Sequence, residues 1–193
     1  MRGIGGALLV AGAMGAWWLS TTSAPPETAA PPAVARDDVS RPAGARTATV
    51  VRVVDGDTLE LRVPEGTRGV PVGDRTPVRL LEIDTPESVE PGAPVECYAK
   101  RAAAELERLA PPGSKVWVLP DKDLVDPYGR TLLYVWNADG EFVNLELVRS
   151  GAARSVLYEP NDRYIGLMRR AEAQARDRGS GVWGRCDFFG ALA

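Results

Sequence analysis

The sequence contains no histidine among its 193 residues. This absence excludes a Ser-His-Asp or Cys-His catalytic system and every zinc site with a histidine ligand. Two cysteines cannot build a structural zinc site alone. Any enzymatic chemistry must therefore rest on Asp, Glu, Lys, Arg and Tyr. The metal that suits such oxygen-rich side chains is a hard cation such as Ca²⁺ or Mg²⁺.

The chain also lacks an excess of basic charge and is poor in aromatic residues. Its formal net charge is −3, and aromatic residues make up 7% of the sequence. A polyanionic substrate would therefore have to be held by local arginines or a cation rather than by overall charge. The 45% hydrophobic content is sufficient for a core, and the length allows one domain plus a tail.

The N-terminal region has the composition of a leader followed by a spacer. Residues 4–19 are uncharged and mostly apolar, but the run is shorter than the roughly 20 residues that span a bilayer comfortably. We interpret residues 1–24 as a signal peptide or an N-terminal membrane anchor, and the two tryptophans in the run keep the anchor alternative open. Residues 25–46, rich in Ala and Pro, are expected to be a disordered spacer. The protein should be secreted or extracytoplasmic.

Beyond residue 46 the pattern predicts alternating strands and helices. A β-branched run at 50–54 and an alternating run at 58–63 flank Asp55-Gly56, which is a strong hairpin signal. The hairpin does not explain a second acid at Asp57. Residues 64–76 are expected to form an exposed excursion. Further strands are predicted at 77–83, 115–119 and 131–136, and helices at 98–110, 143–150 and 161–178, the last capped by Asn161.

Five strands with one helix after the third and two after the fifth indicate an α+β fold that is mainly β barrel. We predict a five-stranded, antiparallel oligonucleotide-binding (OB) barrel with three packed helices, formed by residues 47–187 and followed by a short tail at 188–193.

The stretch from Arg79 to Glu87 combines a strand with charged groups. Apolar residues follow the arginine, Asp84 and Glu87 come at the end, and Pro86 stops the strand because it has no N–H to donate. Carboxylates at a strand end with a cation nearby suit a metal-assisted attack on a phosphate. A strand that runs into a solvated turn explains the same residues without chemistry.

Four sequence blocks occur along the chain in this order: Asp55-Gly56-Asp57-Thr58, Arg79 to Glu87, Asp126-Pro127-Tyr128-Gly129-Arg130, and Asn144 to Gly151, with Glu172 to Ala175 in support. Together they resemble the staphylococcal nuclease (thermonuclease) family over Thr47–Trp183. The resemblance implies a Ca²⁺-dependent endonuclease that hydrolyses phosphodiester bonds of DNA and RNA and leaves 3′-phosphate ends. We expect single strands to be preferred and the protein to be a monomer.

The resemblance also implies roles for individual residues. Its calcium ligands fall on Asp57, Asp84 and the backbone carbonyl of Thr85. Its catalytic residues fall on Arg79, Glu87 and Arg130, and its substrate-binding tyrosines on Tyr128 and Tyr158. Three departures affect substrate contacts: the long 64–76 excursion, Pro127 in place of a lysine, and Val156 in place of a tyrosine.

Two alternatives stay open at this stage. Cys97 and Cys186 most simply form one disulfide in an exported protein, but two free thiols are the alternative. A noncatalytic OB-fold module that binds nucleic acid or protein is the alternative function. It predicts basic, aromatic-rich strand faces, and the negative net charge with few aromatics argues against it.

Overall fold

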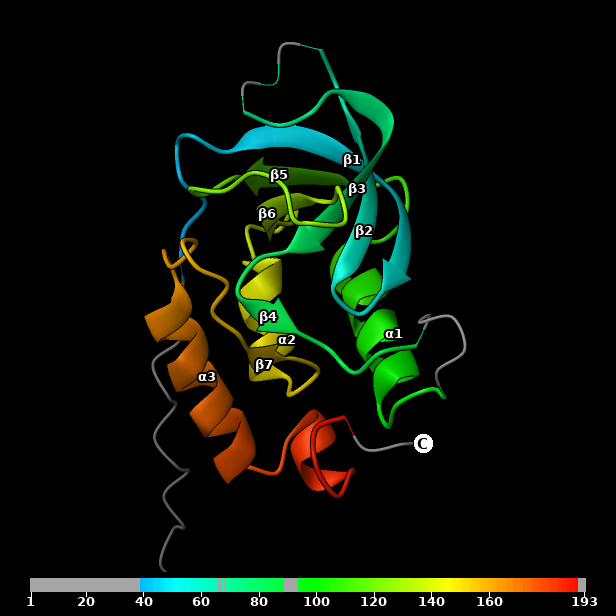
Figure 1. The fold of residues 1–193 in the computed structure, drawn as a ribbon, viewed down its shortest axis with the longest axis vertical. Coiled ribbons are helices and arrows are strands. Elements are labelled where there is room, and N and C mark those ends of the chain that lie inside the picture. Colours follow the sequence, from blue (N-terminus) through cyan, green and yellow to red (C-terminus); the bar gives the residue numbers. More distant parts are fainter. Residues whose placement is uncertain (1–38, 66, 68, 89–93, 191–193) are drawn as a thin grey trace, which may run out of the picture. The chain divides into compact units, whose positions relative to one another are not determined.

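The computed structural model describes residues 39–65, 67, 69–88 and 94–190 (Figure 1). Five strands close into a barrel in the order β1-β2-β3-β6-β5, and a two-stranded sheet pairs β4 with β7. The predicted α+β, five-stranded barrel with three helices is confirmed. The strands are β1 (Arg46–Asp55), β2 (Thr58–Val63), β3 (Gly73–Leu80), β4 (Ile83–Asp84), β5 (Lys115–Leu119), β6 (Thr131–Trp136) and β7 (Arg154–Ser155).

We expected an antiparallel barrel, but the barrel contains both parallel and antiparallel strand pairs. β3 and β6 run parallel, with Val78 opposite Thr131 and Arg79 opposite Leu132. The chain leaves β3 through β4 and a helix and returns along β5, so β6 lies beside β3 in the same direction. Local periodicity identifies strands but not their neighbours, which is why the sequence did not reveal this pairing.

The core follows the alternation of the strands. In β2 the inward residues Leu59, Leu61 and Val63 are buried, whereas all six residues of β6 are buried. Both faces of β6 are covered because helix α2 (Val143–Arg149) packs on it. Asn144 of α2 fixes this packing, since its Oδ1 accepts the N–H of Val135 at 2.9 Å.

The predicted helices are present with shifted ends, as α1 (Ala99–Leu109), α2 and α3 (Ile165–Asp177), followed by the short 3-10 helix η1 (Gly181–Gly184). The prediction that Asn161 caps the last helix is wrong. Its Oδ1 accepts the N–H groups of Lys122 and Asp123 at 2.9 and 2.8 Å, and it therefore fastens the loop after β5. Tyr164 stands at the N-cap position.

The strand predicted at 77–83 is interrupted before its last residue. Leu81 and Glu82 form a turn, with Glu82 in the left-handed region at φ 61°. The short strand β4 then leaves the barrel and pairs with β7. β3 also begins at Gly73, so the end of the expected excursion is strand.

Both ends of the described chain are attached to the domain. Trp136 Nε1 donates to the carbonyl of Val39 at 3.1 Å, and the Arg41 guanidinium lies 4.1 Å from the ring centroid of Trp117. The predicted disulfide between Cys97 and Cys186 is present. The predicted leader lies outside the described residues, and no helix among the residues that are described is long and apolar enough to cross a membrane.

Candidate functional site

Asp57 occupies the turn between β1 and β2, where it is almost completely buried. The two turn residues are Gly56 and Asp57, because Asp55 already pairs with Thr58. A Cβ at Gly56 would lie 2.6 Å from Thr85 Oγ1, so only glycine allows the turn to pack this closely. Asp57 Oδ2 accepts both the N–H and the Oγ1 hydroxyl of Thr85, each at 3.0 Å.

Arg79, in β3, is 7% exposed and is held by four protein oxygens. Its Nη1 donates to the carbonyls of Leu80 and Ile83 at 2.9 and 2.8 Å. Its Nη2 lies 3.0 Å from Asp57 Oδ2 and 3.0 Å from Asp84 Oδ1. Three of the five guanidinium N–H groups donate hydrogen bonds here, and the contact with Asp57 is an ion pair. The turn at Leu81 and Glu82 makes this possible, since it brings the Ile83 carbonyl back toward Arg79.

The two predicted metal-binding carboxylates converge on one point, because both reach the same Arg79 nitrogen. Burial raises the pKa of Asp57 above its ordinary value, and the nearby Arg79 charge opposes that shift. Oxygen donors that already share a cationic partner fit a hard divalent cation in donor type and in placement. The described residues contain no group of three or more His, Cys, Asp or Glu side chains that could hold a metal. A divalent cation at the carboxylates of Asp57 and Asp84 would take its remaining ligands from carbonyl or water oxygens.

Arg154 is a site residue that the sequence did not reveal. It pairs with Asp84 across β4 and β7, and its Nη2 and Nε lie 2.8 and 3.1 Å from Asp84 Oδ2. Its guanidinium also lies 4.5 Å from the ring centroid of Phe189, beyond the disulfide. Both oxygens of Asp84 thus face an arginine. The sequence shows an arginine in a two-residue strand, and only tertiary pairing brings it to Asp84.

Glu87 follows Asp84 by three residues, and its backbone is held from two sides. The Glu87 N–H donates to Glu96 Oε2 at 3.0 Å, and the Glu96 N–H donates to the Glu87 carbonyl at 3.0 Å. The next residue, Ser88, donates its hydroxyl to Asp55 Oδ1 at 2.6 Å. Asp55 is therefore more than a turn residue, since it anchors the segment that carries Glu87.

Arg130 lies at the end of a tight turn that leads into β6. Asp126 organises this turn, because its Oδ1 accepts the N–H groups of Tyr128 and Arg130, each at 2.9 Å, and its Oδ2 accepts Arg130 Nε at 2.7 Å. Arg130 precedes Thr131, which is opposite Val78, so the β3–β6 register places Arg130 near the strand that carries Arg79.

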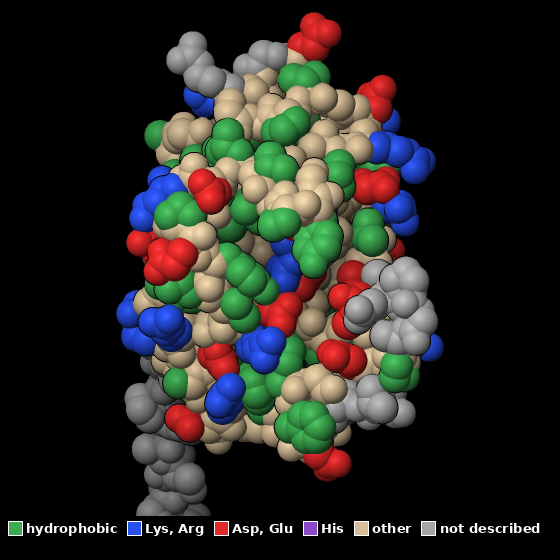
Figure 2. All heavy atoms as spheres, in the orientation of Figure 1, with side chains coloured by type: hydrophobic (Ala, Val, Ile, Leu, Met, Phe, Trp, Pro, Cys, Tyr) green, Lys and Arg blue, Asp and Glu red, His purple; other side chains and the backbone are tan. Residues whose placement is uncertain are grey.

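The two tyrosines expected to bind substrate are both exposed. Tyr128 is 84% exposed, with the Arg130 guanidinium 5.4 Å from its ring centroid. Tyr158 is 48% exposed and follows β7. Acidic and basic side chains meet in a furrow on the face shown in Figure 2, which is the face where β4 and β7 lie in Figure 1.

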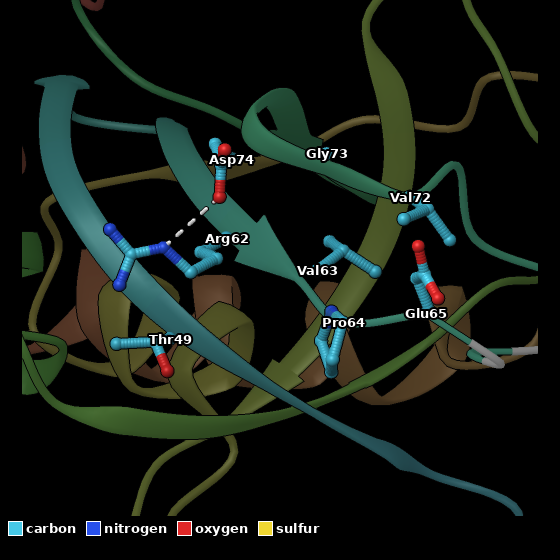
Figure 3. Close-up of a pocket in the computed structure, with 8 residues that line it drawn as sticks. All are labelled: Thr49, Arg62, Val63, Pro64, Glu65, Val72, Gly73 and Asp74. Atoms are coloured by element: carbon cyan, nitrogen blue, oxygen red, sulfur yellow. Dashed lines mark ion pairs between the residues drawn. The ribbon is translucent and has the colours of Figure 1, made fainter.

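A pocket between β1, β2 and the start of β3 is separate from these residues. Figure 3 shows Arg62 and Asp74 on its wall, joined by an ion pair of 3.4 Å. None of the predicted site residues lines it. The pocket therefore contributes nothing to the carboxylate–arginine cluster.

Sequence comparisons agree on the relationship of this chain. A family model described as staphylococcal nuclease homologue matches residues 77–185. The thermonuclease of Staphylococcus intermedius is 38% identical over 136 residues, which is 70% of this chain and 75% of that protein. The thermonuclease of Staphylococcus hyicus is 36% identical over 73% of this chain and 78% of its own length. The endonuclease YncB of Bacillus subtilis is 32% identical over 72% of this chain and 63% of its length. The chain belongs to the staphylococcal nuclease homologue family.

Proposed function

We propose that the chain is an exported nuclease that hydrolyses phosphodiester bonds of DNA and RNA and leaves 3′-phosphate ends. The proposal assigns a Ca²⁺ ion to Asp57, Asp84 and the carbonyl of Thr85. The observation that carries it is the convergence of the two carboxylates on Arg79 Nη2, at 3.0 Å each. The endonuclease and thermonuclease names of the relatives support the reaction class.

The bound cation would supply charge neutralisation at the phosphate. Three Arg79 N–H groups donate to protein oxygens, and Nη2 also forms an ion pair with Asp57. Nη2 would become available for a paired contact with a phosphate once a cation occupies Asp57 and Asp84. The Arg79 Nη1 would remain on the two carbonyls and keep the guanidinium oriented. This arrangement couples phosphate binding by Arg79 to occupation of the carboxylates.

Arg130 and Glu87 complete the proposed site. Arg130 is held by Asp126 through Nε, so its terminal nitrogens can donate to a second phosphate oxygen. Glu87 accepts a proton from the attacking water or orients that water. The exposed Tyr128 ring would contact the substrate, and a single strand would reach these side chains with less distortion than a duplex.

The first test incubates the purified full chain with single-stranded DNA or RNA, with Ca²⁺ or with a chelator. We expect Ca²⁺-dependent cleavage with 3′-phosphate ends identified by mass spectrometry. Glu87→Ser should lower kcat by on the order of 10³ and leave measurable residual cleavage. Arg130→Ala should also lose on the order of 10³ in kcat. Arg108→Ala is the matched control, because Arg108 also pairs with a nearby acid but lies on α1. Binding without cleavage would instead establish a noncatalytic OB-fold module.

A further inference from the structure

We propose that Glu96 is a positioning residue for Glu87, and that the disulfide at Cys97 holds Glu96 in place. The proposal rests on the proposed function, because it concerns how the assigned water-activating carboxylate is oriented. Glu96 lies nine residues beyond Glu87, next to the cysteine that is bonded to the C-terminal region.

Two reciprocal hydrogen bonds connect Glu87 and Glu96. The backbone N–H of Glu96 donates to the carbonyl of Glu87, and the carboxylate of Glu96 accepts the N–H of Glu87, both at 3.0 Å. The backbone of Glu87 is therefore satisfied on both its donor and its acceptor by one residue. A bond from an N–H to a carboxylate is stronger than one to a neutral acceptor.

The segment is also fixed on its other side. The Ser88 hydroxyl donates to Asp55 Oδ1 at 2.6 Å, and the Ser88 N–H reaches Asp55 Oδ2 at 3.3 Å. Asp55 lies in β1, whereas Glu96 precedes α1. Hydrogen bonds to two different elements thus hold two consecutive residues, which leaves the Glu87 backbone little freedom to change conformation.

Glu96 is itself anchored by the end of the chain. Cys97 is bonded to Cys186, and the segment beyond the bond returns to Glu96, since a Cβ added at Gly190 would lie 3.6 Å from Glu96 Oε1. Tyr98 then adopts the left-handed region at φ 72° before α1 begins. The disulfide therefore fixes the residue next to Glu96, and it keeps the segment that follows Cys186 close to the Glu96 carboxylate.

Positioning predicts a loss of turnover without a loss of substrate binding. Glu96→Asp keeps the charge but shortens the side chain, so the carboxylate no longer reaches the Glu87 N–H. We expect kcat for single-stranded DNA at saturating Ca²⁺ to fall about 10- to 100-fold, as for other residues that orient a catalytic group, with KM within about threefold. Glu96→Gln keeps an accepting oxygen and should retain kcat within about threefold.

A double-mutant cycle separates positioning from a structural role. In a Glu87→Ser background that retains measurable turnover, Glu96→Asp should change kcat by less than about twofold, since it acts only through Glu87. Glu105→Asp is the matched control, because Glu105 lies in the neighbouring α1 and pairs only with Arg108 among the contacts described. Its kcat should equal that of the wild type. Thermal unfolding of each variant confirms that the comparison is made between folded proteins.

The outcomes are distinguishable from failure of the proposed function. If the wild type does not cleave, the nuclease proposal fails before any variant is compared. If the wild type cleaves and folded Glu96→Asp has the wild-type kcat, the role of Glu96 is refuted alone. The role of Glu96 is also refuted if Glu96→Asp lowers kcat by the same factor in the Glu87→Ser background as in the wild type. The folded double variant Cys97→Ser/Cys186→Ser should also lose kcat with KM retained, and a wild-type kcat there would overturn the anchoring role of the disulfide.

Discussion

Removal of the Arg154 side chain is expected to tighten the binding of Ca²⁺. Asp84 Oδ2 accepts hydrogen bonds from Nη2 and Nε of Arg154 at 2.8 and 3.1 Å, and a cation that uses this carboxylate must displace them. Because the Arg154 side chain is 44% exposed, the ion pair contributes only about 1 kcal/mol. Its loss corresponds to about a fivefold lower dissociation constant.

Arg154 also repels a dication through space. A guanidinium about 5 Å from a doubly charged ion costs about 1.7 kcal/mol in a water-like dielectric. Screening at physiological salt, where the Debye length is about 8 Å, reduces this to about half. The two effects together predict that Arg154→Ala binds Ca²⁺ roughly 10- to 50-fold more tightly than the wild type.

Isothermal titration of the full chain with Ca²⁺, without nucleic acid, measures this directly. Arg52→Ala is the matched control, because Arg52 is 52% exposed and pairs with Glu60 at 2.7 Å on the barrel. It should bind Ca²⁺ as the wild type does. Arg154→Lys keeps the charge without the two-nitrogen contact, so its affinity for Ca²⁺ should lie between those of the wild type and Arg154→Ala. If Arg154→Ala binds Ca²⁺ no more tightly than the wild type, Asp84 is not the carboxylate at which the cation and Arg154 compete.

Three further substitutions test the fold around the site. Burial raises the pKa of Glu82 above 4.5. At a pH where Glu82 of the wild type is ionised, Glu82→Gln should therefore have the larger free energy of unfolding. This difference should shrink as the pH falls through the pKa of Glu82. Urea unfolding from about pH 8 to about pH 5 measures it, and a constant difference would contradict the assignment. Asn144→Ala leaves the three backbone groups it bonds without their partner and should cost about 2–4 kcal/mol in the same assay. Gly56→Ala forces a methyl group against Thr85 and Ala102. It should cost about 1–3 kcal/mol and weaken Ca²⁺ binding, and a wild-type Ca²⁺ affinity would refute the close packing.

The elements of this fold were predictable where the local pattern determines them. Residues 58–63 alternate, and β2 has those bounds. The helix expected at 98–110 is α1 with one residue fewer at each end. Hydrophobic residues recur with a period of two in strands and 3.6 in helices because one side of each element faces the core. This pattern can be read from the sequence without knowing which elements are neighbours. The parallel β3–β6 contact has no such local signature.

The site was predictable to the extent that its residues lie in recognisable blocks. Asp57, Arg79 and Asp84 are joined in the structure as one cluster. Arg154 and Glu96 were not predicted because each acts through contacts made only in the folded chain. Arg154 pairs with Asp84, 70 residues away, and Glu96 bonds the backbone of Glu87, nine residues away. The prediction for Asn161 was wrong for a related reason. An asparagine before a helix can cap that helix or anchor a loop, and the sequence looks the same in both cases.

The charges around Asp84 explain why Arg154, rather than Arg79, should set the affinity for a cation. Asp57 and Asp84 face Arg79 and Arg154, so a dication meets a neutral cluster rather than a doubly negative one unless one guanidinium withdraws. Arg79 cannot withdraw, because it is buried and its Nη1 is held by two carbonyls. Arg154 can, since it is partly exposed and its only other described contact is the face of Phe189. Withdrawal of Arg154 leaves Asp84 free for the cation while Arg79 stays in place for the phosphate. On the proposed function, Arg154 would therefore set the affinity for the cation, whereas Arg79 would bind the phosphate once the cation occupies Asp57 and Asp84.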